Sequence, residues 1–197
     1  MKLFNIATSG NCHRVRLMLS LLGLSAEIVE MDHKAGALHT PEFLAINPLG
    51  EVPVLQDGTL IQRDSCAILV YLARRYGKPA WLPDDAESAA AIQQWLSIAA
   101  NEIQNGPRMA RAIVLGIVPG DLTARQAATR RLFTEMDRIL REREWLAGAS
   151  ATIADVACYP YVWNAGDGGI AMNDYAHLLA WLRRVEALPG FVAMTRA

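Results

Sequence analysis

The sequence contains few cysteines, and their arrangement matches neither a disulfide framework nor a metal site. Cys12, Cys66 and Cys158 are odd in number and far apart, and no CxxC pair occurs in the 197 residues. A disulfide-stabilised fold and a zinc knuckle are therefore poor interpretations. We expect two of the three thiols to be ordinary buried core groups. The four histidines also lack metal-ligand spacing, so we assign no metal.

Long apolar runs and an excess of one charge are missing as well. The formal net charge is -1 and the basic residues are scattered, which argues against a nucleic-acid partner and against an acidic tail. The N-terminal MKLFNIATSGN turns polar before a signal-peptide core can form, and no later run approaches membrane-spanning length. We therefore expect a cytoplasmic protein with no membrane partner. Because 52% of the residues are hydrophobic, a sizeable core is expected.

The first part of the chain alternates between strand and helix patterns. The order is strand, helix, strand, helix, strand, strand, helix, and the first two strands are expected to run parallel. This is the order of a thioredoxin-like α/β domain. In chain order, the expected elements are a strand at Lys2–Ala7, a turn at Thr8–Asn11, a helix through Val15, Met18, Leu19 and Leu22 that ends at Gly23, a strand at Glu27–Met31, a short helix over 41–45, strands at Val52–Leu55 and Thr59–Ile61 joined through Gln56, Asp57 and Gly58, and a helix over 66–76.

Strand patterns disappear after a segment rich in proline and aspartate at Lys78–Asp85. We therefore predict an N-terminal domain at 1–78, a linker at 79–86 and an all-helical domain at 87–197. The first expected helix has an apolar face from Ile92 to Ile103, is interrupted at Gly106 and Pro107, and resumes over Arg108–Val118. A second helix follows a turn at Pro119–Thr123 and continues through Arg141. A core helix then begins at a Thr152/Asp155 capping box, and the last helix, over 174–187, is amphipathic.

A binding site is indicated in the stretch from Asn47 to Leu72. Proline cannot donate to a sheet ladder, so Pro53 leaves the backbone of Val52 free for a partner outside the sheet. Asp64 and Ser65 then begin a helix, whose N-terminus attracts a carboxylate. Together these features predict a site for a peptide-like, acidic ligand. The alternative is that Asp64 or Ser65 serves only as a helix cap.

Five segments, in their order and spacing, resemble the glutathione S-transferases along essentially the whole chain. They are SGNCHRVRLML, NPLGEVPVL, RDSCAILVYL, TIAD and AWLRRVEALPGF. The resemblance implies a thioredoxin-like N-terminal domain that binds glutathione, an all-α C-terminal domain that forms an adjacent hydrophobic pocket, and a homodimer. It also implies that the cysteinyl segment of glutathione pairs with Val52 before a cis Pro53. The γ-glutamyl carboxylate would lie at Ser65, with Asp64 near the ligand's ammonium group.

The sequence departs from the family pattern where the glycyl carboxylate is expected. Many relatives carry Gln or Lys at the position of Glu51, and a carboxylate there would repel the ligand. The glycyl carboxylate is then bound by the preceding loop, or is bound weakly. The candidates in that loop are His33, Lys34 and His39. In some relatives the partner subunit's long helix reaches the glutamyl group, and the corresponding residues here are Asn101 and Glu102.

Three residues are candidates for activating the glutathione thiol. A thiol titrates near pH 8.5, and a hydrogen bond to its charged form is worth about 1.5 to 3 kcal/mol, or about one to two pKa units. Ser9 stands where serine-type members carry a hydroxyl donor, and Asn11 offers an amide donor. Cys12 would instead form a mixed disulfide, as in bacterial cysteine-type members, and a helix start would lower its pKa. An inert, buried Cys12 is equally expected.

The resemblance implies a transferase in which the glutathione thiolate attacks a small hydrophobic electrophile. A glutathione-dependent disulfide reductase or peroxidase at the same site, and a non-catalytic binding protein, are the alternatives. Residues in the regions that usually line the second-substrate pocket are Met109, Ile113, Trp163, Arg108 and Arg111. Met and aromatic residues at helical spacing also suit a core, while the two arginines would favour an anionic electrophile. The sequence does not decide between these interpretations.

Overall fold

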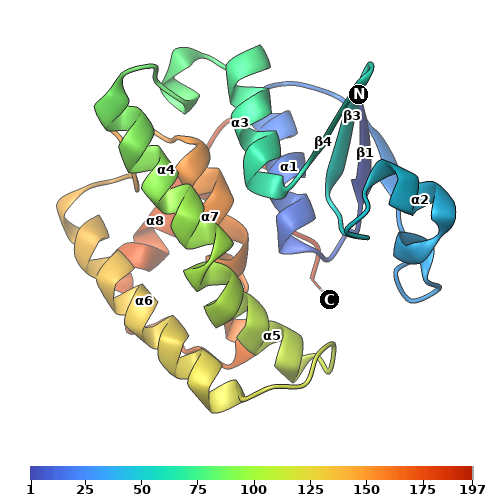
Figure 1. Cartoon of the computed structure of the whole chain (residues 1–197). Helices are drawn as coiled ribbons and strands as arrows, with labels where there is room; N and C mark the ends of the chain where they lie inside the picture. Colours follow the sequence, from blue (N-terminus) through green and yellow to red (C-terminus); the bar gives the residue numbers. More distant parts are fainter. Residues whose placement is uncertain (197) are drawn as a thin grey trace.

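A four-stranded sheet forms the N-terminal part of the structure, a computed structural model that describes residues 1–196 (Figure 1). The strand order is β2-β1-β3-β4, with β1 parallel to β2 and antiparallel to β3. The strands are β1 (Lys2–Asn5), β2 (Glu27–Glu30), β3 (Val54–Asp57) and β4 (Leu60–Arg63). The predicted α/β architecture of this part is confirmed.

Helices cover both faces of the sheet because apolar residues alternate along its central strands. Leu3 and Leu55 face the main core, which they share with α1 (Gly10–Leu21) and α3 (Ser65–Tyr76). Phe4 and Val54 point the other way, onto α2 (Pro41–Ile46). Figure 1 shows α1 and α3 on one side of the sheet and α2 on the other. Short helical turns complete the connections at η1 (Ala37–His39) and η2 (Pro79–Trp81).

Two boundaries near the predicted site differ from the expected ones. β3 begins at Val54 rather than at Val52, because pairing with β1 ends at Val54; the Val52–Pro53 peptide bond before it is cis. The first helix begins at Gly10, inside the expected turn, with Ser9 as its N-cap. The site residues therefore lie at element ends, where their backbone groups are not used by regular structure.

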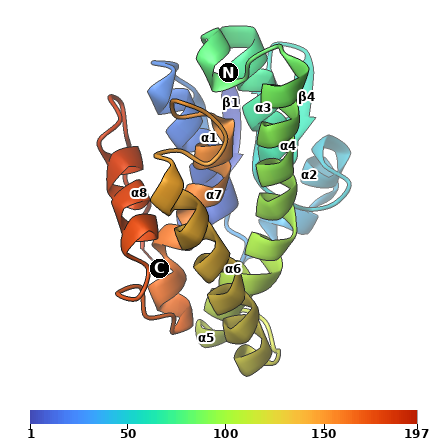
Figure 2. The same cartoon turned by 90° about the vertical axis from the view of Figure 1, so that its left-hand side faces the viewer.

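Helices alone form the rest of the described chain, as predicted. They are α4 (Ala86–Ala100), η3 (Gln104–Arg108), α5 (Met109–Val114), α6 (Leu122–Glu142), α7 (Ile153–Trp163), η4 (Ala165–Gly168) and α8 (Ala176–Glu186). The central helix is α7, which is buried from Ile153 to Val162 and begins with the predicted Thr152/Asp155 capping box. Figure 2 shows α7 with α4 on one side and α8 on the other. No helix among residues 1–196 is long and apolar enough to span a membrane.

The expected interruption at Gly106 and Pro107 is present, as a turn of π-helix between α4 and α5. Gln104–Arg108 forms a turn of π-helix that contains Pro107, which has no N–H to donate. Gly106 lets this turn approach α6, where an added Cβ would lie 3.1 Å from the hydroxyl oxygen of Thr129. The following helix ends at Val114 instead of the expected Val118, since the chain turns at Gly116 with a φ of 69°.

Candidate functional site

A cavity of about 640 Å³ lies between the N-terminal domain and the C-terminal helices. Eight of the candidate site residues named from the sequence line it: Ser9, Asn11, Glu51, Val52, Pro53, Asp64, Ser65 and Arg108. Further lining residues that sequence reasoning missed include Arg14, Asn47, Arg63, Gln104 and Tyr161. The candidate site is thus formed by both parts of the chain.

The backbone of Val52 forms an open edge of this cavity. Among residues 1–196 no hydrogen bond engages its N–H or its carbonyl oxygen. The loop before it is braced by Asn47, whose Nδ2 donates to the carbonyl oxygen of Glu51 at 2.7 Å and whose Oδ1 accepts from the N–H of Leu49 at 3.2 Å. A fixed, unpaired backbone edge is what an extended peptide needs in order to pair with a protein in the manner of a strand.

The N-terminus of α3 faces the same cavity. Asp64 is its N-cap and accepts a hydrogen bond from the N–H of Ala67 at 2.9 Å. Ser65, the first helical residue, is buried but lines the cavity. Asp64 therefore caps the helix, and capping is compatible with ligand binding because the exposed carboxylate has a second oxygen. The first N–H groups of a helix attract an anion.

A buried guanidinium lies directly behind this helix end. The side chain of Arg14 on α1 is 1% exposed. Its Nη1 donates to Ser65 Oγ at 3.0 Å and to Asn11 Oδ1 at 2.9 Å, and its other nitrogens donate to the carbonyl oxygens of Ala157 at 2.6 Å and Ala99 at 3.3 Å. None of the ion pairs among residues 1–196 includes Arg14, so it holds a positive charge at the wall of the cavity.

The sequence carried one signal for Arg14 that our interpretation did not use. Arg14 stands three and four residues before Leu17 and Met18, so it shares the apolar face of α1. An arginine on the core face of a helix is rarely left without partners, because burying its charge is costly.

Hydrogen bonds already made within the protein determine which groups remain to donate into the cavity. Arginine has only donors, so Ser65 Oγ accepts from Arg14 and the hydroxyl proton of Ser65 is left to donate. Asn11 Oδ1 accepts from both Arg14 and Gln104, the latter at 2.7 Å, which leaves its Nδ2 group as a donor. Ser9 Oγ accepts from the N–H of Cys12 at 3.3 Å, so the Ser9 hydroxyl proton is also available. The cavity is therefore rich in donors and suits an anionic ligand.

Cys12 is buried, as in the inert alternative drawn from the sequence. Its side chain is fully buried, and its sulfur accepts a hydrogen bond from the N–H of Ile6 at 3.4 Å. Burial raises the pKa of the Cys12 thiol. This effect outweighs the hydrogen bonds with the Ile6 backbone and the Ser9 side chain, which lower the pKa. Of the two alternatives drawn from the sequence, these observations favour the buried cysteine over one with a lowered pKa. All three cysteines of the chain are buried.

The loop candidates for the glycyl carboxylate lie outside the cavity lining. His33, Lys34 and His39 are all exposed. His39 contacts the edge of the cavity, since its ring would lie 2.9 Å from a Cβ added to Gly50, and Gly50 lines the cavity. Glu51 is exposed and lines the cavity. The role of each in binding a carboxylate stays a prediction.

Of the residues expected around the second substrate, the cavity lining includes Arg108 alone. Met109, Ile113, Arg111 and Trp163 do not line it. Arg111 is buried and pairs with Asp167 at 3.0 Å, which is why it does not contribute its charge to the cavity.

Asn101 and Glu102 are exposed and line a separate groove on the other side of the helix, against α6. No cluster of three or more potential metal ligands occurs within residues 1–196.

Comparison with known proteins places this arrangement in a family. The chain is similar to the Escherichia coli protein "Glutathione S-transferase GstB", with 31% identity, 92% of this chain and 91% of the relative covered. It is also similar to the Escherichia coli "Disulfide-bond oxidoreductase YfcG", with 28% identity, 93% of this chain and 89% of the relative covered.

Solved structures of this type share the fold. A glutathione S-transferase from Pseudomonas fluorescens matches with a TM-score of 0.91 and 32% identity, covering 98% of each chain. A glutathione transferase homologue from Drosophila mojavensis, with bound glutathione, matches with a TM-score of 0.85 and 26% identity, covering 95% of this chain and 87% of the other. The family models for the N-terminal and C-terminal domains of glutathione S-transferase match residues 3–80 and 122–193, so this chain belongs to the glutathione S-transferase family.

Proposed function

We propose that the protein is a glutathione transferase, which deprotonates bound glutathione so that its thiolate sulfur attacks an electrophilic carbon of a small molecule and the glutathionyl group is transferred. The observation that carries the proposal is the open backbone edge at Val52, which shares one cavity with the N-terminus of α3 and with several free donors. An extended tripeptide pairs with the edge through its cysteinyl segment. Its γ-glutamyl carboxylate then accepts from the Ser65 hydroxyl and the helix N–H groups, while Asp64 faces the ammonium group.

Ser9 is proposed as the donor that stabilises the thiolate. Its hydroxyl proton is free because its oxygen already accepts from the N–H of Cys12. Asn11 contributes a second donor through Nδ2, since its oxygen is occupied by Arg14 and Gln104. A hydrogen bond to a charged group is worth about 1.5 to 3 kcal/mol, so one such bond lowers the thiol pKa by about one to two units. Positioning and thiolate stabilisation carry the catalysis, with no covalent enzyme intermediate.

The test is an ultraviolet titration of the thiolate of bound glutathione in the wild type and in variants. Ser9→Ala is expected to raise the thiol pKa by about one unit or more, whereas Ser9→Thr, which keeps the hydroxyl, retains most of the effect. Cys12→Ala is expected to leave the thiol pKa unchanged. Ser25→Ala, at an exposed serine outside the cavity, is the matched control. An unaltered thiol pKa in Ser9→Ala would remove the proposed role of Ser9.

A second candidate function is glutathione-dependent disulfide reduction at the same site, which the similarity to a disulfide-bond oxidoreductase favours. Bound glutathione would attack a disulfide sulfur of the substrate, and a second glutathione would complete the exchange. Turnover with a small glutathione mixed disulfide that exceeds turnover with electrophilic carbon substrates would support this function. A trapped mixed disulfide at Cys12, or activity lost in Cys12→Ala but kept in Ser9→Ala, would assign it to Cys12.

The remaining expectations are part of the proposal. We infer a homodimer in the cytoplasm, with Asn101 or Glu102 near the partner's glutathione, and with His39 or Lys34 at the glycyl end opposite Glu51. Light scattering tests the dimer. A folded protein that calorimetry shows not to bind glutathione would instead indicate a non-catalytic member of the family.

A further inference from the structure

The wall that the C-terminal helices contribute to the cavity carries a positive charge and no negative one. Both carboxylates of the lining, Glu51 and Asp64, belong to the N-terminal domain, on the side proposed to hold glutathione. The residues of the C-terminal wall are Ala100, Gln104, Arg108 and Tyr161. In the proposed function, this wall is where a second substrate meets the glutathione sulfur, and of the two arginines named there from the sequence only Arg108 lines it.

Arg108 has no acidic partner among residues 1–196. It occurs in none of their ion pairs, and its one hydrogen-bond partner there is the thioether sulfur of Met109, 2.9 Å from Nη1. A thioether is a weak acceptor, while a guanidinium has five N–H donors. Arg111, three residues later, is paired with Asp167. The half-buried Arg108 is therefore the residue of this helix whose charge is left for a ligand.

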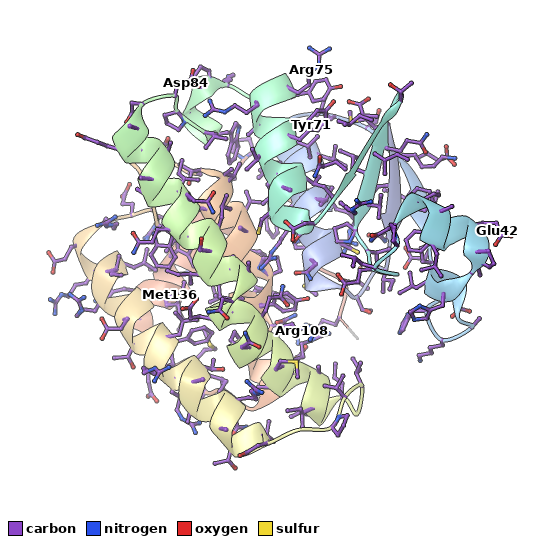
Figure 3. All side chains as sticks on the ribbon, viewed as in Figure 1. Glu42, Tyr71, Arg75, Asp84, Arg108 and Met136 are labelled. Atoms are coloured by element: carbon purple, nitrogen blue, oxygen red, sulfur yellow. The ribbon has the colours of Figure 1, made fainter. Side chains whose placement is uncertain are left out.

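The place of Arg108 along the helix puts it beside the reacting sulfur. Gln104 donates to Asn11 Oδ1 at 2.7 Å, so this face of the helix touches the corner where Ser9 and Asn11 are proposed to hold the thiolate. Arg108 ends the π-helical turn that Gln104 begins, so it lies within one turn of Gln104 along the same helix. In Figure 3 it lies on the side of the helix that faces the N-terminal domain. If the thiolate attacks one end of an aromatic ring, a substituent at the opposite end of the ring can reach Arg108.

We propose that the electrophile of this transferase carries an anionic group, a carboxylate or sulfonate, and that Arg108 binds it. The inference rests on the proposed transferase function and specifies its substrate class. The guanidinium forms a charge-assisted, bidentate pair with the anion, which orients the electrophilic carbon toward the thiolate. Arg108 thus acts as a residue that determines substrate specificity, and the ordinary neutral electrophiles of a hydrophobic pocket are poorer substrates.

The glutathione carboxylates have other places in the proposed binding mode. The γ-glutamyl carboxylate lies at Ser65, in front of Arg14. A tripeptide paired with Val52 runs away from α3, so its glycyl end is directed toward the loop that holds Leu38 and Gly50. Arg108 is on the opposite wall. The contrary possibility, that Arg108 binds glutathione itself, is one outcome of the experiment.

The experiment compares two electrophiles that differ only in charge. One is a chlorodinitrobenzoate with its chloride para to the carboxylate, and the other is the corresponding benzamide. In both, the thiolate sulfur forms a bond to the ring carbon, the carbon–chlorine bond breaks, and chloride leaves with the electron pair, while the thiol proton has gone to solvent. We measure kcat/KM for each probe, and KM for glutathione, in the wild type, Arg108→Gln, Arg108→Lys and Arg183→Gln. Arg183 is an exposed arginine of α8 outside the cavity and serves as the control.

The wild type and Arg183→Gln are expected to prefer the benzoate, after correction for the intrinsic reactivity of each probe. Arg108→Gln is expected to lose about tenfold or more in kcat/KM for the benzoate and less than about threefold for the benzamide, with KM for glutathione unchanged. Arg108→Lys keeps a charge and is expected to retain part of the preference. In the wild type, dinitrobenzoate without the chloride is expected to inhibit competitively against the benzamide.

Other outcomes separate the inference from the function on which it rests. If both probes react but the ratio between them is the same in Arg108→Gln and the wild type, the inference is overturned and the transferase function stands. If KM for glutathione rises equally with both probes, Arg108 binds glutathione, and the inference again fails. If neither probe reacts with the folded wild type, the proposed function itself fails. Should Arg108→Gln not fold, the Arg108→Lys ratio and the inhibition by dinitrobenzoate decide the matter.

Discussion

Replacing Arg14 by methionine is expected to lower both the stability of the protein and its affinity for glutathione. The guanidinium makes hydrogen bonds of 2.6, 2.9, 3.0 and 3.3 Å to acceptors on four different elements or their ends. Hydrogen bonds to a charged group contribute about 1.5 to 3 kcal/mol each, but burying the cation costs several kcal/mol, so we set the net loss at about 3 kcal/mol. In a chain of this size that corresponds to a fall in Tm of about 6 to 12 °C.

The effect on glutathione has a separate cause. Arg14 orients the hydroxyl of Ser65 and the amide of Asn11 toward the ligand and supplies a positive charge behind them. Without it, we expect the Kd for glutathione to rise about tenfold or more, which is about 1.4 kcal/mol. This charge acts on the γ-glutamyl carboxylate. An analogue with aminobutyryl in place of γ-glutamyl lacks that carboxylate, so its affinity should fall much less in Arg14→Met than the affinity for glutathione.

Thermal unfolding followed by circular dichroism measures the first effect, and calorimetry with the two ligands measures the second. Arg183→Met, at an exposed site on α8, is the control for loss of an arginine. A Tm of Arg14→Met within about 2 °C of the wild type would refute the estimate from the four contacts. Equal losses of affinity for glutathione and for the analogue would show that the charge of Arg14 does not act through the carboxylate.

Three further predictions test the packing around the site. Gly10→Ala places a Cβ 2.6 Å from the ring of Tyr161 and is expected to reduce the free energy of unfolding by about 1 to 3 kcal/mol. Gly166→Ala, with nothing within 4 Å, is expected to change it by less than about 0.5 kcal/mol in the same denaturant titration. Burial lowers the pKa of His13 from 6.5 to about 3, so between these two pH values the imidazole is protonated in the unfolded state and neutral in the folded state. The free energy of unfolding should then fall by about 2 kcal/mol from about pH 7 to about pH 5, and His13→Leu, unlike His177→Leu, should abolish that part of the fall. The three buried thiols should not react with a disulfide reagent in the folded protein but should all react after unfolding; one rapidly reacting thiol in the folded state would contradict their burial.

Most of the fold was predictable because its signals are local. The alternation of strand and helix patterns and the Thr152/Asp155 capping box depend on residues adjacent in the chain, and both agree with the structure. The cis Val52–Pro53 bond, which the family resemblance implied, is also present. The exceptions were at helix ends. The helix is interrupted at the Gly106–Pro107 pair as expected, but the form of the interruption, a π-helical turn packed against α6, was not predicted.

The candidate site was predictable in part for the same reason. Ser9, Val52 and Ser65 lie at element ends that the sequence pattern marks, and each of them lines the cavity. Arg111 and Arg108 could not be told apart in this way. Both lie on one helical stretch, and only the position of Asp167 across the fold decides which of them is already paired.

By itself, the amino-acid sequence determined the order of the elements, the open edge beside Pro53 and the helix that begins at Ser65, because each follows from the conformational limits of neighbouring residues. Tertiary structure alone decided that Arg14 lies behind Ser65, that Cys12 is buried, and that Arg108 faces the cavity. These properties depend on how much water and which charges surround a side chain. Residues distant in sequence set that environment, so it exists only once the domains have packed against each other.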